Sequence, residues 1–127
     1  PRNVAQAICQ EQSGQRVILL DCITVLVANL LLDVAGPEED PFDDPSADPF
    51  DMKIEASVLV EVEALLDFVR ETDVDMFMVS NEAGMGLVPP YELGRAYRDI
   101  LGRANQVLAR HADEVYLLVA GLPMQVK

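Results

Sequence analysis

Four consecutive aliphatic residues followed by an acid, at positions 17–21, place the strongest constraint on the fold of this chain. A strand with one face in water alternates apolar and polar residues, whereas an uninterrupted apolar run is typical of a strand covered on both faces, as in a parallel sheet. Residues 16–21 are therefore predicted to form such a strand. The apolar residues 23–32 that follow are predicted to form a buried helix.

Charge and length exclude several classes of function. The 127 residues include 22 acids and 9 bases, for a formal charge of −13. A field of this sign disfavours binding to a nucleic-acid backbone or to an anionic membrane surface. It does not exclude a nucleotide, because local dipoles and metal ions act at short range. The apolar stretch 17–32 is shorter than the roughly 18–20 residues that span a bilayer, and Asp21 interrupts it, so no membrane insertion is expected.

The cysteines point to a reducing compartment. Cys9 and Cys22 form no CxxC motif, and His111 is the single histidine. A zinc site needs three or four nitrogen or sulfur ligands, so none is expected. No secretory signal is recognised in residues 1–12. We expect two reduced thiols in a cytoplasmic protein.

Helical and strand-like stretches alternate along the rest of the chain. Val58, Val62 and Leu65 recur at helical spacing, which outweighs a short strand-like alternation around Val60. The expected helices are 3–12, 23–32, 54–72 and 91–111, and the expected strands are 16–21, 74–80 and 114–120, with a turn at 121–123 and a short strand at 124–127. Strands separated by helices predict a single α/β domain, residues 1–127, with a three-layer, mostly parallel sheet.

Residues 36–51 differ in character from their surroundings. Prolines stand at every fourth position, Pro37, Pro41, Pro45 and Pro49, and seven of the sixteen residues are acidic. This spacing of proline forbids a regular helix, and the acids repel one another. The segment is predicted to be an acidic, Pro-rich surface loop.

Two features at the predicted strand ends are candidates for chemistry. Asp21 ends an apolar strand, as does the acid that holds Mg²⁺ directly or through water in P-loop proteins. The alternative, which stays open, is that it caps the next helix. Residues 80–86 combine Asn81 and Glu82 with two glycines that let a backbone approach a ligand closely. The alternative here is a tight turn with a surface acid.

Several other side chains that could take part in chemistry are more simply explained by structural roles. The arginines of residues 91–111 can meet phosphates, but such a row more often faces solvent and pairs with acids, here Glu92 and Asp99. His111 is expected to have a structural role at a helix end. Three methionines are expected to pack in the core: Met76, Met78 and Met85.

Four stretches together resemble the bifunctional adenosylcobinamide kinase / adenosylcobinamide-phosphate guanylyltransferase family. They read LDCIT at 20–24 (with NLL at 29–31), VSNEAGMGLVP at 79–89, YRDILGRANQ at 97–106 and ADEVYLLVAGLP at 112–123. They occur in the family's order, and only the acidic segment lies outside the resemblance.

The resemblance implies a fold and a reaction. The fold is a P-loop NTPase fold of RecA-like type, often a homotrimer. The reaction uses ATP or GTP to phosphorylate the aminopropanol arm of adenosylcobinamide, then transfers GMP from GTP through a GMP-histidine intermediate. Asp21 matches an acidic residue of the nucleotide site, consistent with a Mg²⁺ ligand, and Asn81 and Glu82 match a loop near the nucleotide.

The family's P-loop and its GMP-carrying histidine have no counterpart here. Both lie upstream of the resembled part, and His111 is excluded from the histidine role by position. The chain therefore resembles the C-terminal part of the enzyme. The alternative is a non-catalytic scaffold or oligomerisation remnant. In either case a shortened parallel sheet exposes edges and apolar faces, so the chain is expected to associate or to lean on a partner.

We predict that these 127 residues alone neither bind GTP tightly nor catalyse either step, because the phosphate-cradling amides and the nucleophile are missing. The check is an assay of the isolated chain with adenosylcobinamide, Mg²⁺ and GTP. Turnover that depends on GTP would contradict the prediction.

Overall fold

A computed structural model describes residues 3–11, 14–35 and 52–127. The elements, in chain order, are α1 (Val4–Glu11), β1 (Val17–Asp21), α2 (Ile23–Ala35), α3 (Met52–Glu71), β2 (Asp75–Val79), α4 (Glu92–His111), β3 (Tyr116–Val119) and β4 (Leu122–Gln125). Every predicted helix and strand is present within a few residues of its expected bounds. The predicted acidic loop at 36–51 lies outside the described residues.

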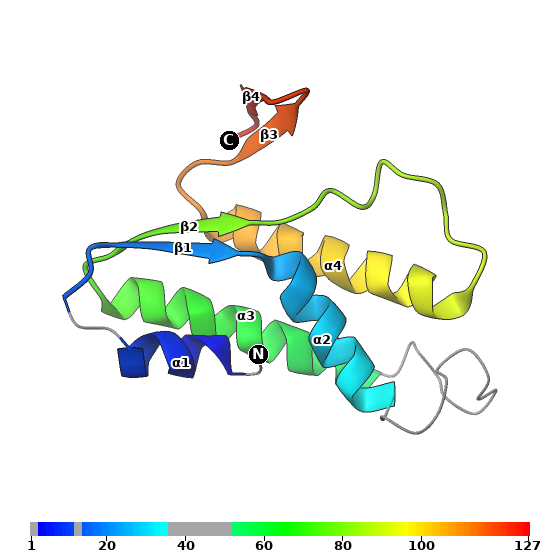
Figure 1. Cartoon of the computed structure of the whole chain (residues 1–127), viewed down its shortest axis with the longest axis horizontal. Helices are drawn as coiled ribbons and strands as arrows, with labels where there is room; N and C mark the ends of the chain where they lie inside the picture. The colour runs from blue at the N-terminus through cyan, green and yellow to red at the C-terminus, as the bar shows by residue number, and fades with distance from the viewer. Residues whose placement is uncertain (1–2, 12–13, 36–51) are drawn as a thin grey trace.

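The strands β1 and β2 pair in parallel and form the centre of the fold (Figure 1). Their register places Leu19 opposite Phe77 and Asp21 opposite Val79. Side chains alternate between the two faces of a strand. Leu20 and Met78 point to the inner face and pack on the core, whereas Leu19 and Phe77 on the outer face are 67% and 61% exposed.

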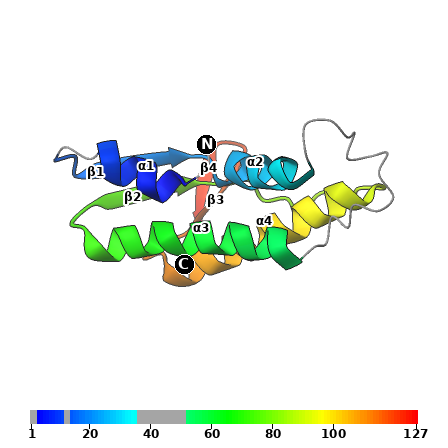
Figure 2. The same ribbon diagram turned by 90° about the horizontal axis from the view of Figure 1, so that it is seen from below.

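Helices cover only the inner face of this sheet. Figures 1 and 2 show α1 and α3 beneath the two strands, and the core lies between the strands and the helices. Its fully buried members come from three helices: Ile23, Val27, Val58, Val62, Leu65 and Leu101. The described residues thus form two layers instead of the predicted three, because nothing covers the outer face of β1 and β2.

The region with ambiguous periodicity is helical. Val58, Val62 and Leu65 lie on one side of α3 and are completely buried, whereas Val60 is 68% exposed on the other. Glu61 is also buried, and its Oε1 accepts a hydrogen bond of 3.3 Å from the amide of Ala5. The carboxylate thereby satisfies one of the free amides at the start of α1 and holds that helix against α3.

The predicted third strand of the parallel sheet pairs differently. β3 forms an antiparallel hairpin with β4, and this hairpin stands clear of β1 and β2, on the opposite side from α1 and α3 (Figure 1). The turn is Ala120 and Gly121, both with positive φ, of 52° and 79°. Two such residues suit the right-handed twist of a two-residue hairpin. The last strand therefore starts at Leu122, earlier than predicted.

Lys127 fixes the hairpin to the end of α4. Its Nζ donates to the carbonyl oxygens of Ala109, Arg110 and Ala112, at 3.1, 3.0 and 2.7 Å. The last carbonyls of a helix lack partners within it and carry partial negative charge, so an ammonium group is stabilising there. No helix in the described ranges is long and apolar enough to cross a membrane.

We predict that Leu65→Ala lowers the free energy of unfolding by about 2–5 kcal/mol, because it leaves a cavity at a completely buried position. Val60→Ala on the exposed side of the same helix is the control, with an expected change within about 0.5 kcal/mol. Urea unfolding followed by circular dichroism measures both. Equal effects of the two substitutions would contradict the packing of α3 described above.

Candidate functional site

Asp21 is the last residue of β1, on the outer face of the sheet, and its side chain is exposed. The peptide bond to Cys22 is cis. Because β1 and β2 are parallel, their carboxyl ends meet at one edge of the sheet, where ligands of open α/β sheets bind. The register puts Asp21 beside Val79, so Asp21 and the loop that starts at Ser80 lie at the same edge.

The first turn of α2 holds the start of this loop. The amide of Asn81 donates to Oγ1 of Thr24 across 2.8 Å. Thr24 stands three residues after Asp21, so one short segment both carries the carboxylate and positions Asn81. The structure thereby brings together Asp21 and Asn81, two of the residues that the sequence singles out.

A second tether comes from α4. Asn105 accepts a hydrogen bond from the hydroxyl of Ser80 at 2.6 Å and donates from Nδ2 to the carbonyl oxygen of Asn81 at 3.0 Å. The carboxamide uses both its acceptor and its donor on adjacent residues, a pairing that a carboxylate does not offer. Asn81 is thus held at its amide by α2 and at its carbonyl by α4.

Glu82 organises the loop from within. Its Oε1 accepts a hydrogen bond from the amide of Gly84 at 2.6 Å, and Arg98 donates to the carbonyl oxygen of Gly84 at 2.7 Å. A Cβ at position 84 would lie 2.7 Å from the Glu82 carboxylate, so a larger residue there would displace this side chain. The structure therefore supports the interpretation of a tight turn with a surface acid, and contact between Glu82 and a nucleotide stays a prediction.

Tyr97 lies against the start of α2. Its hydroxyl donates to the carbonyl oxygen of Thr24 at 3.4 Å. Burial, with a smaller contribution from Cys22, raises the pKa of Tyr97 above its ordinary value of 10.0. The phenol is consequently neutral at physiological pH and acts as a hydrogen-bond donor.

Three arginines of α4 interact with their own chain. Arg95 donates to the carbonyl oxygens of Pro89 and Pro90 at 3.3 and 2.8 Å, and its Nη2 is 3.8 Å from the Glu92 carboxylate. Arg103 pairs with Glu55 of α3 at 2.8 Å and not with the expected Asp99. The expected pairing with Glu92 is present, whereas Arg98 and most contacts of Arg95 are made to backbone carbonyl oxygens.

The methionine expectation is wrong at one position. Met76 and Met78 are half-buried on the inner face of β2, as predicted, but Met85 is 78% exposed. Met85 lies in the loop that follows the strand, and Leu87, two residues further on, is 96% exposed. Spacing along the sequence does not reveal that the chain leaves the core after Ala83.

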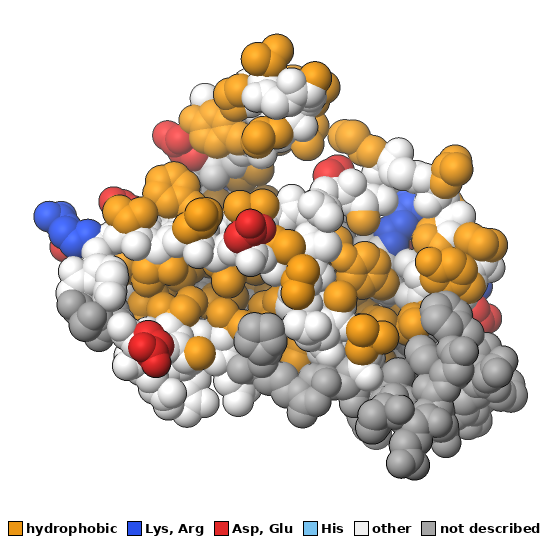
Figure 3. All heavy atoms as spheres, viewed as in Figure 1, with side chains coloured by type: hydrophobic (Ala, Val, Ile, Leu, Met, Phe, Trp, Pro, Cys, Tyr) orange, Lys and Arg blue, Asp and Glu red, His pale blue; other side chains and the backbone are white. Residues whose placement is uncertain are grey.

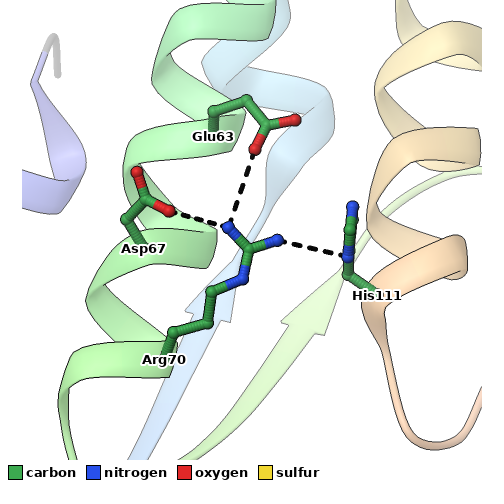
Figure 4. Close-up of polar contacts among 4 residues, drawn as sticks. All are labelled: Glu63, Asp67, Arg70 and His111. Atoms are coloured by element: carbon green, nitrogen blue, oxygen red, sulfur yellow. Dashed lines mark hydrogen bonds and ion pairs between the residues drawn. The ribbon is translucent and has the colours of Figure 1, made fainter.

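His111, at the end of α4, faces Arg70 of α3 (Figure 4). Its Nδ1 is 3.2 Å from Nη2 of Arg70, whose Nη1 is 2.7 Å from Asp67 and 4.0 Å from Glu63. Arg70 is close in sequence to the amino end of β2, whereas Asp21 lies at the carboxyl ends of β1 and β2. The histidine thus joins the ends of α3 and α4, consistent with the expected structural role.

The described residues hold no group of three or more His, Cys, Asp or Glu side chains suited to a metal ion. A single exposed carboxylate, Asp21, stands at the strand ends. Mg²⁺ is commonly held by one or two carboxylates together with water and substrate phosphates. Asp21 therefore fits an ion that arrives with a nucleotide, and it does not fit an ion held by protein ligands alone.

Sequence reasoning from chemistry did not find Thr24, Ser80 and Asn105 as positioning residues. They are small polar residues without a local motif, and their partners are 24 to 57 residues away. All three residues fall within the stretches that carry the family resemblance, and this is the signal that points to them.

These observations define a class: an α/β protein with a candidate site at the carboxyl ends of adjacent parallel strands. The family described as cobinamide kinase / cobinamide phosphate guanyltransferase matches residues 1–126, and this chain belongs to it. The chain is similar to the bifunctional adenosylcobalamin biosynthesis protein CobU of Escherichia coli (39% identical over 127 residues) and of Salmonella typhimurium (36% over 126), and to CobP of Pseudomonas aeruginosa (35% over 127).

The matches cover 99%, 99% and 100% of this chain but 66%, 66% and 62% of the three relatives. The chain thus spans slightly less than two thirds of the length of these curated relatives. About one third of the family's length lies outside the match.

We predict that Thr24→Val speeds hydrogen exchange of the Asn81 amide about fivefold, because a net hydrogen bond contributes roughly 1 kcal/mol. Valine keeps the shape of threonine and removes the acceptor. The control is Thr72→Val, since Thr72 bonds to Phe68 at the far end of the fold. An unchanged Asn81 exchange rate would show that Thr24 does not hold the loop.

Proposed function

We propose that this chain acts in cobalamin biosynthesis as the part of a cobinamide kinase and guanylyltransferase that presents Asp21 and residues 80–86 to a nucleotide. The supporting observation is the juxtaposition of Asp21 and Asn81 at the carboxyl ends of β1 and β2. Asn81 donates a hydrogen bond to Thr24 and accepts one from Asn105, and these two bonds give it a defined place before any ligand arrives. Family membership supplies the reaction class.

The proposed reaction has two steps, both at the aminopropanol arm of adenosylcobinamide. In the first, the hydroxyl of the arm takes the terminal phosphoryl group of ATP or GTP, which releases ADP or GDP. In the second, that phosphate takes GMP from GTP, which releases pyrophosphate. Both steps require a nucleotide whose phosphates lie within reach of Asp21, with the loop after β2 beside them.

Asp21 is proposed to hold Mg²⁺, directly or through water, beside the nucleotide phosphates. Bound there, the ion would neutralise phosphate charge and orient the phosphates. Asn81 and Glu82 are proposed to line the nucleotide site. The Glu82 carboxylate already accepts the Gly84 amide, so its contribution is to shape the loop as well as to face the ligand.

The remaining parts of the machinery are proposed to come from the third of the family's length outside the match. The resemblance places the phosphate-cradling loop and the GMP-carrying histidine there, in a P-loop fold of RecA-like type. It also implies a homotrimer, which sedimentation of the completed protein would reveal as three copies.

We predict that Asp21→Asn weakens Mg²⁺-dependent GTP binding by roughly tenfold or more once the missing part is supplied, because a charge interaction of about 1.5–3 kcal/mol is lost. The chain is produced together with the part of the E. coli relative that lies outside the match. GTP affinity and the release of GDP and pyrophosphate are measured in the presence of adenosylcobinamide.

The control is Asp75→Asn, an exposed acid at the opposite end of the same face. The proposal expects Asp75→Asn to bind GTP as the unchanged chain does. Equal loss in both variants would indicate a nonspecific charge effect, and an assembled complex without either product would favour the non-catalytic scaffold.

A further inference from the structure

The outer face of β1 and β2 is an exposed apolar surface. Four of its six residues are apolar: Val17, Leu19, Phe77 and Val79, with 59%, 67%, 61% and 42% of their surface exposed. Figure 3 shows apolar side chains gathered over this side of the molecule, broken by single acidic side chains. We call these four residues the outer patch.

The sequences of β1 and β2 are typical of a sheet whose two faces are both covered by other parts of a protein. β1 reads VILLD and β2 reads DMFMV, so apolar residues follow one another on both faces. Parallel sheets occur almost only with both faces covered, and strands that face water on one side alternate with polar residues instead. The outer patch therefore has the composition of a core surface, yet it lies in solvent.

The β3–β4 hairpin extends this surface. It stands on the same side of the strands (Figure 1), and its apolar side chains are about half to three quarters exposed: Tyr116, Leu118, Val119, Leu122, Met124 and Val126. Exposed apolar area on this scale typically marks an interaction site. The hairpin is held by Lys127 at its base, so the surface is fixed in place.

Charge disfavours both the acidic segment 36–51 and a second copy of the chain as the group that covers this face. Residues 36–51 include seven acids, and the outer face already carries Asp21 and Asp75 at its two ends. A second copy would bring the same two acids and a further charge of −13. Like charges placed opposite each other cost free energy, and in a two-fold interface the same patch meets itself.

We propose that the outer patch and the hairpin are the docking surface for the part of the family's chain that lies outside the match. That part is about one third of the length of the relatives, enough for further strands and helices. Asp21 lies on the same face as the outer patch, so the docked part would lie directly beside the candidate nucleotide site. This proposal rests on family membership and not on the proposed activity.

The test is direct binding between two polypeptides. The part of the E. coli relative outside the match is made separately with a fluorescent label, and its anisotropy is followed as the chain is added. For reference, the E. coli relative is divided at the boundary of its match with this chain, and the affinity between its own two parts is measured in the same way. We expect a complex that holds the two polypeptides in equal numbers. We expect Leu19→Glu with Phe77→Glu to weaken it at least about tenfold, as for the central residues of an interface.

Val60→Glu is the matched control, because Val60 is 68% exposed on α3, on the other side of the fold, and Leu19 is 67% exposed on the outer patch. Val60→Glu is expected to bind as the unchanged chain does, and circular dichroism verifies that all variants are folded. Equal weakening by both changes would overturn the proposal. It would also be overturned if the divided E. coli protein reassembles but the chain does not bind, or if light scattering shows self-association that Leu19→Glu with Phe77→Glu abolishes.

Asp21→Asn separates this inference from the proposed function. The inference expects the variant to form the complex normally, whereas the proposed function expects it to lose GTP binding. If the complex formed by the unchanged chain binds no nucleotide, the proposed function is refuted and the docking surface stands.

Discussion

The parallel pairing of β1 with β2 is the contact on which the rest of the structure depends. It joins segments that are more than fifty residues apart in the chain, and its register aligns Asp21 with Val79. The same pairing turns Leu20 and Met78 toward the helices, where they pack on the core of α2, α3 and α4. One ladder of backbone hydrogen bonds thus fixes both the hydrophobic packing and the position of the candidate site.

Side chains from α2 and α4 hold the loop that follows β2 in one conformation. The Thr24 hydroxyl and the Asn105 carboxamide hold Asn81 from opposite sides, and Arg98 holds Gly84. These are mostly neutral groups with short contacts, so the loop does not depend on long-range charge. A loop held in place before a ligand arrives costs less entropy to bind one, which is the advantage that these contacts would give the candidate site.

The one-sided cover of the sheet has an energetic consequence. Burial of apolar area stabilises a fold by roughly 25 cal/mol per Å², and the outer patch does not contribute while it lies in water. A chain of this size is then held chiefly by its helical layer, where Val58, Val62, Leu65 and Leu101 are completely buried. If the outer face were covered, burial of its apolar side chains would add to the free energy of unfolding.

Local patterns determined most of the secondary structure. Apolar runs identified β1 and β2, and helical spacing identified α3 and α4, because these signals come from neighbours a few residues apart. The positions of Asp21 and Asn81 at strand ends also followed from sequence, since parallel strands end at a common edge. Tertiary structure alone decided that β3 pairs with β4, that Met85 leaves the core, and that Thr24 and Asn105 meet the loop. Those outcomes depend on contacts between residues that are distant in the chain. For β3 they also depend on which strand is available to pair with it. Local sequence patterns encode neither of these.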